Sequence, residues 1–283
     1  GIAACLNNLA KIEMLAHPTQ TAREMLEESL AIRRELSDHQ RAAEVLGNLG
    51  LWHRFKGELP VASARLEEAA DCARKHRDRW LLGQTQANLA VIYRTQGRMD
   101  TALAAATEAA SSARCLGDEA LECEALDYLG MTERDLGRTA DAAATHEKAA
   151  ATARRGSLAT QEAYALASLV IDRPDAEPRS IKEHLRRAAR SATGNTSAKL
   201  HARLMEAGAR SSLAAGDVAQ ALEQARAAME RATEGNLPEA RVSASLGAGH
   251  CLLAGGGLPA GGGAQAASSQ MDPLVQAAEF ATH

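Results

Sequence analysis

Leucines recur every forty residues along the chain, most of them followed by a small residue, and this pattern predicts a repeat architecture. The leucines stand at Leu9, Leu49, Leu89, Leu129 and Leu169. Asparagine precedes the first three of them, at Asn8, Asn48 and Asn88, and is replaced by Tyr128 and then Ser168 in the next two copies. Equal spacing over five copies is typical of arrays in which one small unit stacks on its neighbours.

Residues 38–77 show what one unit is made of. Asp38 stands where a helix N-cap is expected, because its carboxylate can accept hydrogen bonds from the first free backbone N–H groups. Gly57 is expected to close this first helix in the left-handed conformation. Pro60 then starts a second helix, where its missing N–H is harmless, and that helix is expected to fade near His76. Each unit is therefore predicted to be a helical hairpin.

The chain is accordingly predicted to be all-α, a right-handed superhelical solenoid of about seven antiparallel helix-turn-helix repeats. The aromatic content of only 2% and the scarcity of strand-favouring residues support helices. The array is expected over 1–257, with units at about 1–37, 38–77, 78–117, 118–156, 157–195, 196–235 and 236–257 onward. Pro174 and Pro178 predict a longer irregular turn at 172–180. Residues 258–283 are expected to form a degenerate last repeat with a glycine-rich exit and a short capping helix.

The residues of each hairpin resemble those of tetratricopeptide repeats. The second unit has Leu46, Leu49, Gly50 and His53, leading to Ala62 and Leu66, and the next units repeat the scheme. The period is 40 instead of 34, as in the long repeats of kinesin light chains and LGN-type scaffold proteins. Strings such as "LEESLAIRRELSD" are more similar to the C-terminal arms of bacterial signalling ATPases and of AfsR- or LuxR-type transcription activators. The resemblance is strong over about 1–155 and weaker to 257.

Asparagine and arginine recur on the side of the first helices opposite to the packing leucines. At 100° per residue, Asn48 and Arg54 flank Leu51 on one face. In repeats of this class the first helices line the inside of the superhelix, so these positions are expected to line a peptide-binding groove. The candidate groove residues are Asn8, Asn48, Leu51, Arg54, Asn88, Val91, Arg94, Tyr128, Met131 and Arg134.

Two interpretations of this row remain open. The amides could bond to neighbouring helices and set the stacking angle, since asparagine is a poor residue for a helix interior. Alternatively, an asparagine ladder could bond the backbone of an extended peptide, as in the scaffolds that the sequence resembles. The arginines favour an acidic or C-terminal peptide, because guanidinium groups prefer carboxylates or phosphates.

Composition bears on the partners and the cellular location of the protein. The net charge is −4 with both signs interspersed, which gives no general reason to expect nucleic acid. The five cysteines form no CxxC pair, which suggests reduced thiols and a cytoplasmic protein. No apolar stretch approaches a membrane span. The chain starts at Gly1 inside a helical pattern, so it is expected to be a piece of a longer protein.

No catalytic, metal or cofactor site is expected. The histidines show no ligand spacing, and His53 is expected to be a core residue. The glycine-rich stretch 255–263 lacks the Lys-Ser/Thr of a phosphate loop. A basic excess between Arg179 and Arg203 could meet other domains of the parent protein, whereas nucleic acid is not expected because stacking aromatics are missing.

The sequence therefore predicts a non-catalytic scaffold that binds protein or peptide in its groove. The interpretation that we favour from the sequence is the sensor or interaction arm of a bacterial transcription regulator or signalling ATPase. The alternatives are a stand-alone peptide-pheromone receptor or assembly scaffold, and an accessory domain of an enzyme such as a protease.

Overall fold

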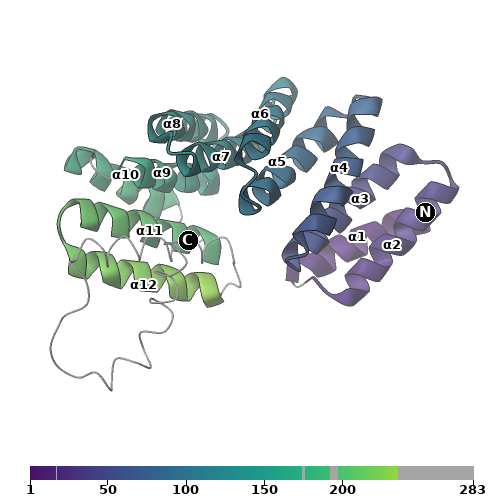
Figure 1. The fold of residues 1–283 in the computed structure, drawn as a ribbon, viewed down its shortest axis with the longest axis horizontal. Coiled ribbons are helices and arrows are strands. Elements are labelled where there is room, and N and C mark those ends of the chain that lie inside the picture. The colour runs from purple at the N-terminus through teal and green to yellow at the C-terminus, as the bar shows by residue number, and fades with distance from the viewer. Residues whose placement is uncertain (17, 174–175, 192–196, 235–283) are drawn as a thin grey trace, which may run out of the picture. The chain divides into compact units, whose positions relative to one another are not determined.

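A computed structural model describes residues 1–16, 18–173, 176–191 and 197–234, and these residues form helices without any strand (Figure 1). The helices are α1 (Ile2–Ala16), α2 (Gln20–Glu35), α3 (His39–Phe55), α4 (Leu59–His76), α5 (Arg79–Thr95), α6 (Met99–Leu116), α7 (Glu119–Asp135), α8 (Thr139–Arg155), α9 (Ala159–Asp172), α10 (Pro178–Ser191), α11 (Ala198–Ala214) and α12 (Val218–Glu234). The prediction of an all-α repeat solenoid is confirmed. The expected seventh unit, the stretch 255–263 and the capping helix lie outside the described residues.

The first helices start as the sequence predicts. Asp38, Asp78 and Asp118 each cap one of them, with a side-chain oxygen that accepts from the backbone N–H three residues on, at 3.3, 3.0 and 3.0 Å. Just after three of these helices, the chain turns at glycines with φ of +76°, +74° and +76°, at Gly57, Gly97 and Gly137. Glycine reaches this conformation without the clash of a Cβ atom, so each hairpin turn is encoded locally.

The second helices end in the same left-handed conformation, although only one of the residues there is glycine. Gly117 follows α6 with φ of +68°, and at the corresponding place after α4 Arg77 has φ of +57°. Ser37 and Ser157 take the same conformation, with φ of +53° and +55°. Side chains rarely adopt this backbone geometry, so the turns between hairpins carry a local cost.

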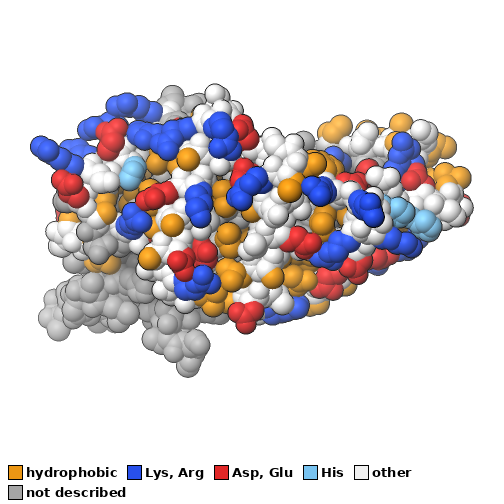
Figure 2. Space-filling model, turned by 90° about the horizontal axis from the view of Figure 1, so that it is seen from above, with side chains coloured by type: hydrophobic (Ala, Val, Ile, Leu, Met, Phe, Trp, Pro, Cys, Tyr) orange, Lys and Arg blue, Asp and Glu red, His pale blue; other side chains and the backbone are white. Residues whose placement is uncertain are grey.

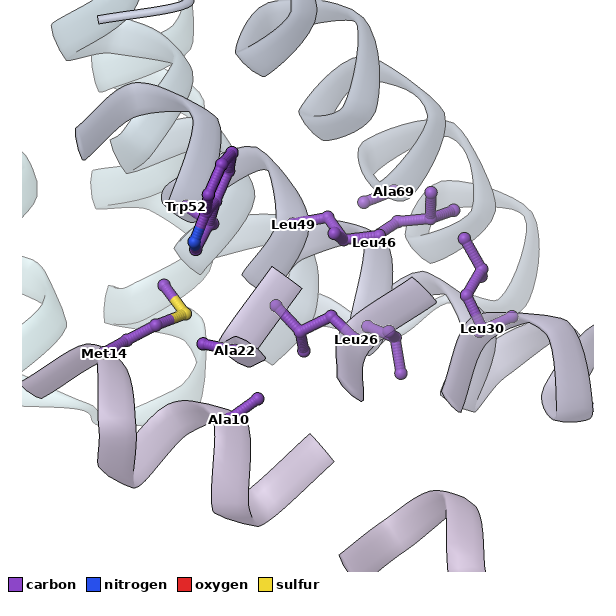
Figure 3. Close-up of a cluster of buried hydrophobic side chains, with 11 residues drawn as sticks. Ala10, Met14, Ala22, Leu26, Leu30, Leu46, Leu49, Trp52 and Ala69 are labelled. Atoms are coloured by element: carbon purple, nitrogen blue, oxygen red, sulfur yellow. The ribbon is translucent and has the colours of Figure 1, made fainter. Parts of the chain in front are cut away.

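Residues 1–138 form a compact N-terminal unit that contains α1 to α7. Its first core cluster joins four successive helices, with Met14 from α1, Leu26 from α2, Leu46 from α3 and Ala69 from α4 among its members (Figure 3). Trp52 completes the cluster, and its Nε1 donates to the carbonyl of the Thr19 residue at 2.8 Å. The first helix α3 thus packs both on its own second helix, α4, and on α2 of the preceding hairpin.

Leu9 is an exception to the repeating pattern. It matches Leu49 and Leu89 in sequence, and those two leucines are each 2% exposed, yet 53% of Leu9 is exposed. The reason is that α1 has no second helix on its outer side among the described residues. Only its inner residues, including Ala10 at 0% exposure, pack against α2 and α3.

The C-terminal unit starts at Thr139 and is described up to residue 234, with α8 to α12. Its core includes Val170 and Ile171 of α9, Ile181 of α10 and Ala207 of α11. The connection between α9 and α10 spans residues 173–177, which is longer than the three-residue turn between α3 and α4. Pro178 itself begins α10, where a proline needs no N–H partner.

Candidate functional site

One side of the first helices in the N-terminal unit carries a row of amide and charged side chains. We define this polar row as Asn7 of α1, Asn48 and Arg54 of α3, Asn88 and Arg94 of α5, and Asp135 of α7. Asp135 is exposed as a whole residue, and its side chain is 30% exposed. The other five members of the row are partly exposed. The row is therefore reachable from solvent while its members stay close enough to bond one another.

The polar row links each first helix to the next. Asn48 Nδ2 donates to Asn7 Oδ1 at 2.8 Å, which joins α3 to α1. Arg54 Nη1 donates to Asn88 Oδ1 at 2.9 Å, which joins α3 to α5. Asn88 also donates to the carbonyl of Gln84, one turn earlier in its own helix. The amide groups thus contribute to helix stacking, as one of the two interpretations of the sequence expects.

The strongest link of the row is ionic. Arg94 Nε lies 2.6 Å from Asp135 Oδ2, and these side chains are 16% and 30% exposed. A charge-assisted bond of this kind is stronger than a bond between neutral groups. Because the site remains open to solvent, however, another carboxylate could replace Asp135 at the guanidinium group without first being buried deeply. Arg94 is accordingly the best placed cation for recognising an acidic ligand.

The other candidate residues differ in accessibility. Asn8 is exposed, and its neighbour Asn7 is the residue that bonds Asn48. Leu51 and Arg134 are partly exposed. Val91, Tyr128 and Met131 are only 2%, 6% and 7% exposed, so they offer little surface to a ligand. The accessible part of the candidate groove is therefore concentrated on the polar row of α1, α3 and α5.

A second row of ion pairs, on the second helices, was not anticipated from the sequence. Arg34 of α2 pairs with Glu68 of α4 at 2.8 Å, and Arg74 of α4 pairs with Glu108 of α6 at the same distance. The hydrogen bond that Arg74 donates to Glu108 raises the pKa of Arg74 above its usual value. The sequence signal is an arginine followed 34 residues later by a glutamate.

A hollow of about 320 Å³ lies between α4, α5 and α6 beside this second row. Its polar groups bond one another: Gln86 donates to Glu108 at 2.6 Å, and the Tyr93 hydroxyl donates to Glu67 at 2.7 Å. Burial and the bond to Glu67 raise the pKa of Tyr93, which keeps the phenol protonated. The polar groups of the hollow are thus bonded to one another, as those of the polar row are.

The basic segment predicted after Arg179 lies on α10, which exposes Arg179, Lys182, Arg186 and Arg190. Figure 2 shows lysine and arginine side chains, with some acidic ones among them, in the region where Figure 1 places α10. His53 is 6% exposed and packs edge-on against Trp52, as a core histidine. The described residues contain no cluster of potential metal ligands and no helix long and apolar enough to cross a membrane.

Comparisons with known proteins agree on the architecture. Residues 1–75 match the tetratricopeptide repeat family. The apo form of RapI has a similar fold, with a TM-score of 0.76 and 10% identity over 99% of this chain and 96% of RapI. The signal transduction ATPase with a tetratricopeptide repeat sensor from Pyrococcus horikoshii gives a TM-score of 0.64 and 15% identity, over 99% of this chain and 42% of that protein.

A third similar structure is the Rap conjugation gene regulator of plasmid pLS20 in complex with the Phr* peptide. Its TM-score is 0.68 and its identity 14%, over 96% of this chain and 72% of that one. No protein with curated annotation matches the sequence. At these identities the structural similarities establish the fold alone. Residues 1–75 thus match the tetratricopeptide repeat family in sequence, and the chain has the all-α repeat fold of these solved structures.

Proposed function

We propose that the chain is a non-catalytic peptide-binding scaffold whose N-terminal unit holds an acidic or C-terminal peptide along the polar row. The observation that carries this proposal is the solvent-accessible pairing of Arg94 with Asp135, continued along the row by Arg54 with Asn88 and by Asn48 with Asn7. These groups offer donors and acceptors at successive helices, which is the arrangement that an extended peptide backbone can follow.

The biological context that we propose is the sensor or interaction arm of a bacterial transcription regulator or signalling ATPase in the cytoplasm. It is supported by the similarity to the Pyrococcus horikoshii ATPase, which contains a tetratricopeptide repeat sensor and of which this chain covers 42%. Other domains of such a parent protein would then be further partners.

A stand-alone peptide receptor is the second candidate, and one observation favours it. The match to RapI extends over 96% of that protein, and two Rap structures in the comparison contain a bound factor or peptide. The reading frame upstream of Gly1 separates the two contexts. A DNA-binding or nucleotide-binding module there supports the arm, and a start codon next to Gly1 supports the receptor.

Binding follows a simple exchange in this proposal. A peptide carboxylate replaces Asp135 at the Arg94 guanidinium, and backbone amide groups of the peptide bond Asn48 and Asn88. Asp135 therefore acts as an internal competitor, so its removal is expected to strengthen binding. A few such bonds contribute about 1–3 kcal/mol, which corresponds to roughly ten- to hundredfold in affinity.

The test is selection from a library of random hexapeptides against the immobilised protein, followed by calorimetry of the enriched sequences. We expect enrichment of acidic sequences, tighter binding to Asp135→Asn and loss of binding to Arg94→Glu. Arg65→Glu, at a partly exposed arginine on α4, is the matched control and should bind normally. If the library gives no enrichment, or if Arg94→Glu binds the same peptides as the original protein, the proposal is wrong.

Asn48→Ala combined with Asn88→Ala tests the amide part of the row. If these residues contact the peptide, the double variant should lose affinity in the fully folded protein. If they only set the stacking of helices, any loss should disappear once the folded fraction, measured by circular dichroism, is taken into account.

A further inference from the structure

One face of α10 carries a line of exposed basic side chains. At 100° per residue they fall within a sector of about 80°. The members of this basic line are Arg179, Lys182, Arg186 and Arg190. The opposite side of the helix is apolar, with Ile181 and Ala188 at 6% and 0% exposure, and Ile181 joins residues of α9 and α11 in the core. The helix α10 is therefore held in its unit by one face and presents the basic line to solvent on the other.

The charge bias of α10 sets it apart from the other second helices of the described residues. Acidic and basic residues occur in comparable numbers in α2, α4, α6, α8 and α12. By contrast, α10 has five basic residues and one acidic residue, Glu183. The whole chain has a net charge of −4, so the positive surface of α10 is a local feature.

The carboxylates around α10 leave most of the basic line without a partner. Glu183 pairs with Arg186 at 3.2 Å, and Glu162 of α9 pairs at 2.5 Å with Arg187, which lies beside the line. Among the residues that the structure describes, no carboxylate pairs with the other three members of the basic line. Because like charges that lie close together repel one another, this surface is complementary to an acidic partner.

The spacing of the basic line indicates the shape of that partner. Its members follow one another at intervals of three, four and four residues. They therefore span about 16 Å along the helix axis. A second α-helix that lies alongside has the same rise, so carboxylates at the same intervals can meet all four cations. In an extended segment, side chains on one side recur only about every 6.6 Å, which is out of step with the basic line.

A nucleic acid fits this surface less well than an acidic helix. The sequence of α10 contains no phenylalanine, tyrosine or tryptophan on which a base could stack. If α10 entered a groove of a duplex, phosphates would lie on both flanks of the basic line. One flank carries Glu183, whose side chain is 52% exposed and would meet phosphates of its own charge. An acidic helix can instead contact the line alone.

We propose that the basic line of α10 is a docking surface for one acidic helix of a partner protein, with carboxylates at intervals of three and four residues along one side. The contact is made at the surface between charged groups, so it weakens as salt screens them. The basic line lies in the C-terminal unit and is separate from the polar row, and its role does not depend on the function proposed for that row.

A designed helix serves as the probe. It is a fluorescein-labelled alanine-based peptide of about 20 residues, long enough to form helix in water, with four glutamates at intervals of three, four and four residues. A peptide of the same composition, with its glutamates distributed around the helix, is the control probe. Fluorescence anisotropy measures the binding of each probe to the full chain. We expect the first probe to bind at least about tenfold more tightly than the control at low salt, and its affinity to fall as salt is added.

Charge exchange between protein and probe identifies the surface. Lys182→Glu combined with Arg186→Glu should abolish binding of the glutamate probe and should allow binding of a probe with lysines in place of the glutamates. Circular dichroism checks that this double variant is folded. Lys75→Glu combined with Arg79→Glu, at exposed residues of α4 and α5, changes the net charge equally and should keep the affinity within about twofold. Arg94→Glu, in the polar row, should leave the affinity for this probe unchanged.

Equal binding of the two glutamate probes, or no binding of either, would overturn this assignment, as would normal binding of the glutamate probe to the folded double variant. Loss of binding in Arg94→Glu alone would place the probe on the polar row instead. A duplex DNA or single-stranded RNA of the same charge that binds more tightly than the helix, and that the double variant no longer binds, would assign the basic line to nucleic acid.

Discussion

The N-terminal and C-terminal units connect their helical hairpins by polar contacts of different kinds. In the N-terminal unit the contacts are accessible: Arg34 with Glu68 and Arg74 with Glu108 are pairs of side chains that are 37% to 53% exposed. The C-terminal unit also has an accessible pair, Arg173 with Glu147, whose side chains are 48% and 51% exposed. This unit adds links of a second kind: His146 of α8 contacts Asp172 at the end of α9, and both of these side chains are fully buried. Arg203 of α11 likewise donates to the buried Ser168 of α9.

Sequence positions explain part of this difference. Glu68 and Glu108, the glutamates of the second row of ion pairs, stand forty residues apart. The residue forty positions after Glu108 is Lys148. Gly50, which lets α3 approach α4 closely, has Val170 as its counterpart in α9. The same hairpin architecture thus tolerates either accessible or buried links between its parts. Only accessible links can be exchanged for a ligand, and the N-terminal unit carries a row of such links along its first helices.

The largest effect is expected from breaking a buried link. Asp172→Ala leaves His146 without its carboxylate partner in the interior, which should destabilise the C-terminal unit by about 3 kcal/mol. Asp135→Ala removes a carboxylate from the accessible pair in the other unit and should cost less than about 1 kcal/mol. Hydrogen exchange measured peptide by peptide assigns each loss to its unit. Equal losses from the two substitutions would remove the distinction between buried and accessible links.

The next largest loss of stability is expected where α3 packs closely on α4 in the N-terminal unit. A Cβ atom on Gly50 would lie 2.6 Å from Leu66 Cγ and 3.2 Å from the carbonyl oxygen of Ala62. Gly50→Ala should therefore destabilise this unit by about 1–3 kcal/mol. Gly47 lies one turn earlier in α3, where a Cβ would meet nothing closer than 3.8 Å. Gly47→Ala should instead stabilise the helix by up to about 1 kcal/mol, and a chemical denaturation series compares the two.

A smaller loss of stability is expected when a glutamate in the second row of ion pairs is replaced by the lysine found at the equivalent position of the C-terminal unit. Glu108→Lys places a lysine where Lys148 stands in the next repeat and sets it against Arg74. The loss should be about 0.5–1 kcal/mol at low salt and should shrink as salt screens the charges. Denaturation at two salt concentrations measures it. A loss that does not depend on salt would show that the glutamate acts through packing and not through charge.

The smallest effect concerns the turns between hairpins. Arg77 has φ of +57° at the place where Gly117 stands in the next repeat. Arg77→Gly relieves this strain but increases the freedom of the unfolded chain, so a net gain of about 0.5 kcal/mol is expected. Thermal unfolding should show the gain, and Gly117→Arg should show a loss of similar size. A loss in both variants would mean that Arg77 makes a contact worth more than the strain.

Local features of the fold could be predicted from the sequence because their causes are local. Asp38 caps α3 and Gly57 closes it through backbone bonds within a few residues. The polar row could be located as well, since helical rotation fixes which residues share a face. Its individual links could not, because they depend on the stacking of different repeats. Asn48 therefore bonds Asn7, although the repeat spacing points to Asn8.

Two classes of contact escaped prediction for physical reasons. Arg34 and Glu68 look like ordinary solvated residues, since nothing near either of them in the sequence marks the other as its partner. Asp172 was assigned to the start of an irregular turn, but its side chain is fully buried beside His146. A carboxylate at the end of a helix gives no local sign that the next layer of structure will cover it.

Three of the links described above have the same separation in sequence. Arg34 with Glu68, Arg54 with Asn88, and Arg74 with Glu108 are each 34 residues apart. A gene segment that encodes one repeat therefore encodes the donor of the hydrogen bond to one neighbouring repeat and the acceptor of the hydrogen bond from the other neighbour. Tandem duplication of that segment creates a complete joint without any new mutation, and deletion of a whole copy leaves matching ends. Where these pairs recur, the array can therefore change its length in evolution by whole repeats and keep compatible junctions, and Lys148 in place of a glutamate marks the end of that stretch.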